Sequence, residues 1–276
     1  VRRVLLRRGG FATGPGDGFQ SGRGGGELDG RAWLEGEVVA GRVDDVQGTG
    51  GGAEEARRGL FSGDCWYFRA RARVLARMVS RRLPPDSWVL DVGCGDGRLA
   101  AALPQYRWCG VEPDPVLREA ARARGVRVLP GCAEELPFPD GAFDAACLFD
   151  VLEHLEDDRA ALAEARRVLK PGGLLFVSVP LHPELWSAHD SACGHFRRYR
   201  KGEAAGLAAS LGFAVLERRY FVSLLLPLAW LARRLGRGGP DRLPGPLDRV
   251  AEEVLILDAG LRLPFGLTEV VVCVRA

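Results

Sequence analysis

The sequence predicts an α/β fold in which helices cover both faces of a mainly parallel sheet, and three observations lead to it. Strand-like apolar runs alternate with helical segments from residue 64 to the C-terminus, and this alternation requires parallel strands with right-handed crossovers. Residues 143–149 are nearly all apolar, as expected for a central strand covered on both faces. A glycine-rich turn at 93–97 follows an apolar run and opens a helix. With 276 residues and 47% hydrophobic content, the chain can bury a full core.

Helices are expected where apolar residues recur at helical spacing. Proline is tolerated in the first turn of the helix that begins at Pro115, and Pro171 with the two glycines after it should end the preceding helix. The helices are expected, in chain order, from 64 to near 84, at 98–103, from 115 onward, at 159–169 and at 203–211. Strands are expected, in chain order, at 88–92, 107–111, 126–129, 143–149, 174–179, 213–220 and 269–274.

Two parts of the chain lie outside a minimal α/β pattern. Residues 1–60 hold 17 of the 37 glycines without sustained periodicity, so they are expected to be a disordered extension. A basic interaction arm and a translated region upstream of the true start are the alternatives. The folded domain is expected at 61–276, with a helical insertion at 221–266.

The insertion begins with an apolar run at 221–232 that arginines flank on both sides. It is too short to span a bilayer, which takes about 20 residues. One interpretation is a helix packed on the sheet or roofing the site. The other is a helix lying at the membrane surface, which predicts peripheral contact with the inner face of the membrane through 221–234.

Composition narrows the class of protein further. The formal net charge is only +2, so no strong field points to nucleic acid or to a membrane. The seven cysteines form no C-x-x-C pair, which predicts reduced thiols rather than a disulfide framework or zinc site. We therefore predict no metal site. The apolar run near the N-terminus is too short for a secretion signal, so we expect a cytoplasmic protein.

The turn at 93–97 has the composition of a nucleotide-binding turn. Glycines at alternate positions let the backbone turn tightly and approach a ligand, and the following helix presents unpaired N–H groups. Arg98 occupies the position where a dinucleotide fingerprint has its third glycine. Asp91 closes the first strand, and Glu112 ends the second, where α/β nucleotide folds place a carboxylate on the ribose hydroxyls. The glycines of the turn are Gly93, Gly95 and Gly97.

Five segments in chain order resemble the motifs of class I S-adenosylmethionine-dependent methyltransferases. They are Val89–Gly97, Gly110–Pro113, Leu136–Phe138 with Phe143–Asp144, Asp150–His154 and Arg167–Gly173. Within that family the resemblance is to bacterial small-molecule methyltransferases. These carry an aromatic and arginine segment before the first strand, here Trp66–Arg71, and a histidine and arginine segment after the fifth, here Leu185–Tyr199. The resemblance implies a Rossmann-like seven-stranded sheet in the order 3-2-1-4-5-7-6, with the last strand antiparallel.

The resemblance also implies the cofactor, S-adenosyl-L-methionine, and the residues that bind it. The methionine end is expected at Asp91 and the turn, the ribose at Glu112, and the pocket beneath the sulfonium at 149–151. Cys132 stands where the family usually has an Asp for the adenine, so this contact is expected to pass to the next two residues. Arg71 is expected to reach the carboxylate of the cofactor if the first helix folds over it. The predicted set is Asp91, Gly93, Cys94, Gly95, Gly97, Glu112, Pro113, Cys132, Ala133, Glu134, Phe149, Asp150, Val151 and Arg71.

Candidate catalytic and acceptor-binding residues follow strands four and five. A base is needed only if the acceptor must lose a proton, and a carboxylate beside a histidine raises its basicity and fixes its tautomer. The catalytic candidates are His195, His189 and His154. The predicted acceptor-binding residues are Trp186, Asp190, Arg197, Arg198 and Tyr199. The two arginines are either a solvated helix start or forks that bind an anionic acceptor.

The predicted function is methyl transfer from S-adenosylmethionine to a small-molecule, glycan or lipid-linked acceptor. A non-catalytic binding module of the same fold is the alternative, but it should have a damaged turn or lack the ribose acid. A nicotinamide-dependent oxidoreductase would need the glycine that Arg98 replaces. A nucleic-acid methyltransferase would show a proline-rich motif after strand four and a basic surface, so no nucleic-acid partner is predicted.

Overall fold

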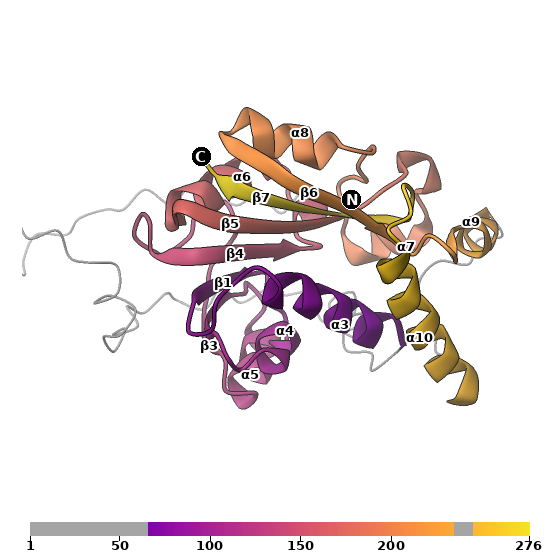
Figure 1. The fold of residues 1–276 in the computed structure, drawn as a ribbon, viewed down its shortest axis with the longest axis horizontal. Helices are drawn as coiled ribbons and strands as arrows, with labels where there is room; N and C mark the ends of the chain where they lie inside the picture. Colours follow the sequence, from indigo (N-terminus) through magenta and orange to yellow (C-terminus); the bar gives the residue numbers. More distant parts are fainter. Residues whose placement is uncertain (1–65, 235–244) are drawn as a thin grey trace, which may run out of the picture.

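The computed structural model describes residues 66–234 and 245–276, which form a seven-stranded sheet with helices on both faces (Figure 1). The strand order is β3-β2-β1-β4-β5-β7-β6, with β7 antiparallel to both of its neighbours, so the expected order is confirmed. The strands are β1 Trp88–Val92, β2 Arg107–Val111, β3 Arg127–Leu129, β4 Phe143–Phe149, β5 Leu169–Pro180, β6 Phe213–Phe221 and β7 Thr268–Arg275. The extension expected at 1–60 lies outside the described residues.

The helices include those that the periodicity predicts, together with short ones between residues 152 and 193 that it does not predict. They are α3 Trp66–Ser80, α4 Arg98–Ala102, α5 Pro115–Ala123, η1 Leu152–His154, α6 Asp158–Val168, η2 Pro183–Leu185, α7 Ala188–Cys193, α8 Glu203–Ser210, α9 Leu226–Arg234 and α10 Gly245–Leu261. In α5, the carboxylate of Asp114 accepts hydrogen bonds from the N–H groups of Val116 and Leu117, and Pro115 occupies the first turn. This cap fixes where the helix begins, directly after the end of β2.

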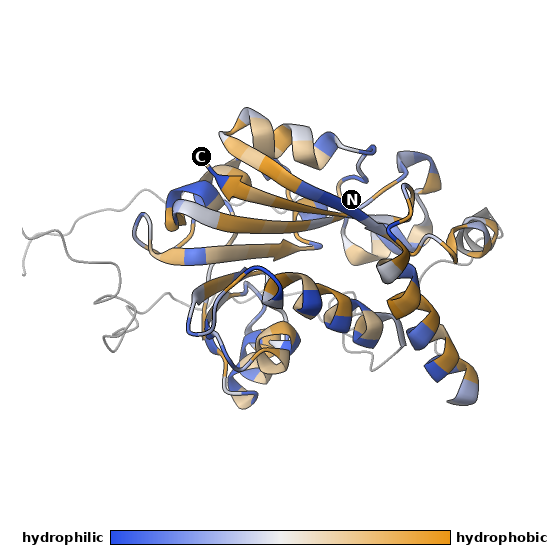
Figure 2. Cartoon of the chain, in the orientation of Figure 1, coloured by the Kyte–Doolittle hydropathy of each residue, from blue (hydrophilic) through white to orange (hydrophobic). Residues whose placement is uncertain are grey.

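Two hydrophobic clusters fill the two faces of the sheet. Successive side chains of β5 point to opposite faces, so Leu175 and Val177 belong to one cluster and Phe176 to the other. The first cluster packs under α6 and α8, and the second under α3 and α10. Figure 2 shows the apolar character concentrated along the central strands. This packing fixes the carboxyl ends of β1, β2 and β4 at one edge of the sheet.

Strand β5 is longer than expected. Its first residue, Leu169, pairs with Phe143, whereas Leu174 pairs with Ala145, so between these two pairs β5 has the four residues 170–173 where β4 has only Asp144. Gly172 has φ +76°, a conformation that favours glycine. Helix α6 therefore ends at Val168, before the Pro-Gly-Gly sequence that was expected to end it, because pairing with β4 already recruits Leu169.

The segment between β6 and β7 contains α9 and α10. Phe221, the first residue of the predicted insertion, completes β6. Helix α10 packs against α3, and Arg69 of α3 donates hydrogen bonds to Asp248 and Glu252 of α10. No helix within 66–234 or 245–276 is both long enough and apolar enough to cross a membrane.

Candidate functional site

The turn after β1 is held against β2 by backbone hydrogen bonds. The N–H groups of Gly93 and Cys94 donate to the carbonyl oxygen of Val111 at 2.8 and 3.1 Å. Gly93 and Gly95 have φ +67° and +55°, and a Cβ at Gly93 would lie 2.8 Å from Cγ2 of Val151. A Cβ at Gly95 would meet no atom within 4 Å, so the backbone there faces open space. The turn thus needs glycine and leaves room for a ligand to approach its backbone.

Glu112 at the end of β2 is locked to this turn. Its Oε2 accepts a hydrogen bond from the N–H of Gly95 at 2.9 Å, and its Oε1 accepts one from the N–H of Asp114 at 3.0 Å. Burial raises the pKa of Glu112, while the two backbone N–H groups act to lower it. A carboxylate has about four lone-pair positions, so each oxygen can still accept a further hydrogen bond. This geometry fits the predicted role on two ribose hydroxyls.

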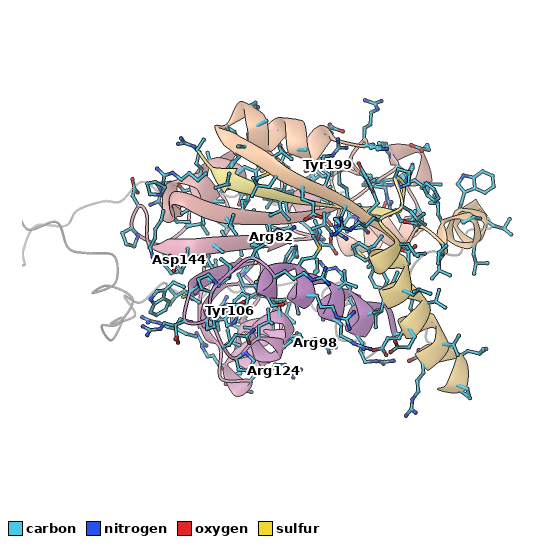
Figure 3. The ribbon with its side chains drawn as sticks, in the orientation of Figure 1. Arg82, Arg98, Tyr106, Arg124, Asp144 and Tyr199 are labelled. Carbon is cyan, nitrogen blue, oxygen red and sulfur yellow. The ribbon has the colours of Figure 1, made fainter. Side chains whose placement is uncertain are left out.

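Arg98 begins the helix after the turn and has a partner within the chain. Its Nε donates to Oδ2 of Asp96 at 2.7 Å, and the same oxygen accepts from Arg124 at 3.2 Å. Figure 3 labels the two arginines. The arginine that replaces the third glycine of a dinucleotide fingerprint therefore takes part in an ion pair at the helix start.

A buried acid and a buried arginine lie beside the turn. Asp91 is 4% exposed, and burial raises its pKa to about 7, although the charge of Arg71 acts to lower it. Arg71 reaches from α3 to Asp150, with 2.7 Å between Nη2 and Oδ2. The Nε of Arg71 is buried and makes no hydrogen bond in the described part of the chain. A donor without a partner beside two carboxylates fits a site that binds the carboxylate end of an amino acid.

Asp150 follows β4 in a strained conformation. Its φ is +57°, which is uncommon for a residue with a side chain. Ser178 of β5 stabilises it, because the Ser178 hydroxyl donates to Oδ1 of Asp150 at 2.7 Å. Phe149 is half-buried, and the side chain of Val151 is buried against Gly93. The predicted residues 149–151 and the turn therefore meet in the structure.

The predicted adenine segment forms a small loop after β3. Cys132 and Glu135 form an isolated antiparallel bridge, and the N–H of Glu135 donates to the carbonyl oxygen of Cys132 at 3.4 Å. Cys132 is exposed, Ala133 is buried and Glu134 is half-buried. Pro113 directly follows Glu112, and its carbonyl oxygen accepts a hydrogen bond from Arg118 at 2.7 Å.

Three side chains gather beyond the end of β4, on the acceptor side. His154 of η1 and His195 pack edge to face, with ring centroids 4.6 Å apart and an interplanar angle of 84°. Glu153 lies beside them and is 1% exposed. Burial, followed by the charge of Asp150, raises the pKa of Glu153 well above its usual value. Two of the predicted catalytic histidines are thus together, although 40 residues of chain separate them in sequence.

Asp190 holds His195 in place. Its Oδ1 accepts from the Nε of Arg198 at 2.7 Å and lies 3.2 Å from Nδ1 of His195, while Oδ2 accepts from the N–H and hydroxyl of Ser187. Burial acts to raise the pKa of Asp190, but the bond from His195 and the charge of Arg198 outweigh it and the pKa is lowered. His189, the other predicted base, contacts Sγ of Cys193 instead, at 3.5 Å from Nε2.

The arginines predicted to bind an acceptor are engaged within the domain. Arg198 is buried and donates to Asp190 and to the carbonyl oxygen of Leu181. Arg197 donates to Oδ2 of Asp158 at 3.1 Å, and the Tyr199 hydroxyl donates to the same oxygen at 2.8 Å. In this conformation their donors stabilise the segment rather than face an acceptor.

Trp186 is 42% exposed, and its ring N–H donates to the hydroxyl of Ser191 at 3.2 Å. Sequence reasoning did not single out Glu153 or Ser178. Glu153 carried one signal, since it lies in the Asp150–His154 motif directly after a central strand. Ser178 carried no signal in the sequence, because its hydrogen bond to Asp150 depends on β4 and β5 being neighbours.

Comparisons with known proteins point to a methyltransferase family. Residues 90–177 match the family model described as a methyltransferase domain, and this range includes the turn, Glu112 and the 149–154 segment. Over these residues the chain is similar to class I S-adenosylmethionine-dependent methyltransferases. The confirmed strand order is the one that this family implies, and the family cofactor is S-adenosyl-L-methionine.

Relatives with this domain are found in mycobacteria. A probable S-adenosylmethionine-dependent methyltransferase of Mycolicibacterium smegmatis is 34% identical over 156 residues, covering 54% of this chain and 60% of that protein. One from Mycobacterium tuberculosis is 30% identical over 154 residues, covering 54% of this chain and 56% of that protein. The chain therefore spans less than two thirds of the length of these relatives.

Solved structures share the fold. A SAM-dependent methyltransferase of Thermotoga maritima has a TM-score of 0.51 at 25% identity, covering 76% of this chain and 93% of that one. A Haloferax volcanii protein solved in complex with the Trm112 methyltransferase activator has a TM-score of 0.55 at 21% identity, covering 81% and 95%. At 21% identity, the likeness to the Haloferax volcanii protein shows a shared fold alone.

Proposed function

We propose that this chain transfers a methyl group from S-adenosylmethionine to a hydroxyl-bearing small molecule, glycan or lipid-linked acceptor. One observation carries the proposal: the Glu112 carboxylate is locked to the N–H of Gly95, and the cluster of Glu153, His154 and His195 lies past the end of β4 in the same domain. Intact cofactor-binding features together with chemically active side chains favour an enzyme over a non-catalytic binding module.

The residues present suit each part of the cofactor. Asp91 offers a carboxylate to an ammonium group, and the unsatisfied Nε of Arg71 offers a donor to a carboxylate. Glu112 offers its remaining lone pairs to two ribose hydroxyls. When bound, the cofactor supplies a methyl group on a positively charged sulfur. The protein then has to position the acceptor and exclude water, which can supply much of the rate acceleration.

A hydroxyl acceptor has to lose its proton, and the cluster of Glu153, His154 and His195 is suited to promote this. Asp190 is an acceptor at Oδ1, so in the neutral imidazole of His195 the hydrogen lies on Nδ1 and the lone pair on Nε2. We propose that the acceptor hydroxyl binds at this cluster. His189 lies outside it, because its ring contacts Cys193.

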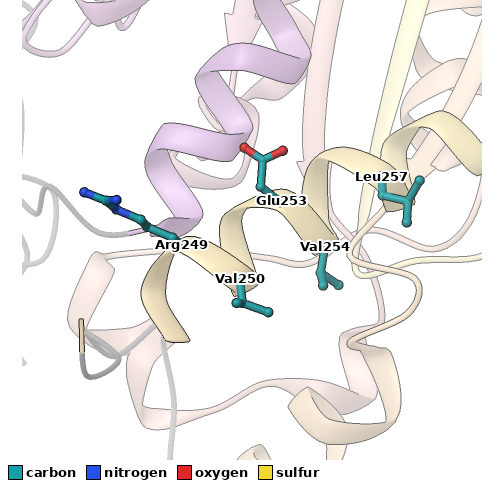
Figure 4. A pocket seen from close by; sticks show the side chains of 5 residues that line it. All are labelled: Arg249, Val250, Glu253, Val254 and Leu257. Atoms are coloured by element: carbon teal, nitrogen blue, oxygen red, sulfur yellow. The ribbon is translucent and has the colours of Figure 1, made fainter. Parts of the chain in front are cut away.

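A lipid-linked acceptor is favoured by the surface of α9 and α10. These helices expose large apolar side chains whose exposed fractions run from 40% to 66%, namely Leu228, Trp230, Leu231, Leu247, Val250, Leu257 and Leu261. A hollow of about 370 Å³ lies on α10. Val250, Val254 and Leu257 project from one side of the helix there, whereas Glu253 points toward α3 and accepts from Arg73 (Figure 4). An apolar helix face of this kind suits the boundary of a lipid layer.

The methyl-transfer proposal is tested by a binding measurement followed by a screen. Calorimetry of the full chain should show affinity for S-adenosylmethionine and negligible affinity for NAD. Labelled cofactor should then transfer label to an acceptor in small-molecule, glycan or lipid-linked extracts. Cofactor affinity without transfer to any extract would favour the non-catalytic alternative, and affinity for NAD alone would contradict the proposal.

The lipid contact is tested by sedimentation with phosphatidylglycerol-containing vesicles. We expect Leu228→Asp combined with Leu231→Asp to reduce the bound fraction, because each change removes an exposed apolar contact from α9. Leu216→Asp is the matched control, since Leu216 is 55% exposed but lies on β6. Equal binding by all three proteins would contradict the membrane contact.

A further inference from the structure

Three side chains with metal-binding atoms converge past the end of β4. Glu153 and His154 belong to η1, and His195 follows α7. One carboxylate oxygen and one ring nitrogen from each histidine lie within 4.8 Å of one another. Ligands around a single zinc-sized ion each lie about 2.0–2.2 Å from it, so small side-chain adjustments bring these atoms to bonding distance.

Glu153 provides a second, independent observation. The residue is 1% exposed, and its Oε2 makes no hydrogen bond in the described part of the chain. A buried carboxylate oxygen without a partner is costly, whether the group is charged or neutral. The nearby guanidinium groups of Arg71 and Arg198 pair with Asp150 and Asp190, and neither donates a hydrogen bond to Oε2 of Glu153. A cation between Glu153 and the histidines would supply the missing partner.

His195 has the surroundings of a metal-binding histidine. Its Nδ1 lies 3.2 Å from Oδ1 of Asp190, and the ion pair with Arg198 keeps that carboxylate in place. Histidines that bind metals almost always donate their second ring N–H to a carboxylate, carbonyl or water, which orients the other nitrogen toward the ion. Asp190 and Arg198 are positioning residues in this arrangement.

We propose that Glu153, His154 and His195 bind a divalent first-row transition-metal ion, such as Zn²⁺. Two imidazoles with one carboxylate are a ligand set of catalytic zinc sites, which leave a position open for water or substrate. Mg²⁺ and Ca²⁺ prefer oxygen ligands and fit this set less well.

The role of the ion rests on the proposed function. An acceptor hydroxyl that enters the open position forms an oxygen–metal bond, and the charge of the ion lowers the pKa of that hydroxyl. Its O–H bond then breaks and the proton passes to water, which leaves an oxygen with an electron pair for bond formation. Metal binding itself does not depend on the acceptor, so it can be measured alone.

The test uses the full chain after removal of bound metal with a chelator. Titration with Zn²⁺ in a calorimeter should show one ion per chain, and Co²⁺ should give visible absorption bands typical of four- or five-coordinate nitrogen and oxygen ligands. His195→Ala and Glu153→Gln should each weaken Zn²⁺ binding by at least about tenfold. His182→Ala is the matched control, because His182 bonds to Glu184 and Gly266 and lies outside the cluster.

Melting temperature and S-adenosylmethionine affinity are measured for each variant. A Glu153→Gln protein that keeps both while losing the metal supports the site, and the Co²⁺ spectrum of the unsubstituted chain tests the site even if that variant fails to fold. Cofactor binding without metal binding would overturn this inference and leave the proposed function standing. Metal binding without cofactor binding would overturn the proposed function instead. Zn²⁺ binding that neither cluster variant changes would also overturn the inference.

Discussion

The part of the domain that we propose for the cofactor (the cofactor half) and the part that we propose for the acceptor (the acceptor half) are built in different ways. The cofactor half comprises β1, β2 and the turn 93–97, and its contacts are short backbone hydrogen bonds, such as those from Gly93 and Gly95. The acceptor half comprises residues 152–199, and buried charged side chains hold it together. Its central contact joins Arg198 and Asp190, which are 4% and 0% exposed. A backbone site depends on glycines and local sequence, whereas a charged network depends on every partner being present.

The largest expected effect is a loss of stability when the charged network of the acceptor half is broken. Asp190→Ala should lower the free energy of unfolding by about 3–5 kcal/mol, because it leaves the buried Arg198 without its partner. Chemical denaturation measures the change. Asp140→Ala is the control, since Asp140 is 78% exposed and pairs with Arg167, and it should change the free energy by less than about 1 kcal/mol. Similar small losses in both variants would remove the distinction between the two halves.

The second effect concerns the buried acid of the cofactor half. Burial raises the pKa of Asp91 from its ordinary value of 3.8 to about 7 in the folded chain. Between these two pH values the folded chain therefore binds more protons than the unfolded chain does. The Asp91 contribution to stability is therefore fully present below about pH 4 and is lost as pH rises toward 7. The slope is at most about 1.4 kcal/mol per pH unit.

Comparison with Asp91→Asn isolates this contribution from the other titrating groups. The free energy of unfolding of the unsubstituted chain, minus that of the variant, should fall between pH 4 and 7 and level off above. Urea denaturation at intervals of pH gives this difference. If this difference in free energy does not change between pH 4 and 7, the pKa of Asp91 is not raised by burial.

A smaller effect is expected from Glu112→Ala. It removes the carboxylate assigned to both ribose hydroxyls, so S-adenosylmethionine affinity should fall at least tenfold, which corresponds to about 1.4 kcal/mol. Calorimetry measures the affinity. Glu119→Ala is the control, because the Glu119 side chain is 77% exposed on α5 and its removal should leave the affinity unchanged. An unchanged affinity in the Glu112 variant would refute the ribose assignment.

The smallest expected effect comes from deleting residues 1–58. Both large hydrophobic clusters of the described residues are made by side chains from Trp66 onward, so the core is complete without the deleted segment. Melting temperature and cofactor affinity should stay unchanged, as measured by calorimetry. A fall in melting temperature would show that the segment contributes to the fold.

Much of the cofactor half could be predicted from the sequence. The glycines at 93, 95 and 97 fix a turn because only glycine adopts those positive φ angles without strain, and such a turn has a recognisable spacing. Glu112 could be placed because it ends a strand that directly follows the turn helix. The exact start of β5 could not be predicted, since the pairing of Leu169 with Phe143 depends on a neighbouring strand rather than on local sequence.

The sequence by itself determined the fold class and the cofactor turn, because hydrophobic periodicity and glycine spacing are local properties. It also named His154 and His195 as candidates, but it could not bring them together. Only the tertiary structure decided that Glu153 is buried beside both histidines and that Asp190 holds His195 and Arg198. The physical reason is that burial and pairing of side chains are set by which strands and helices pack together, and these contacts join residues far apart in the chain.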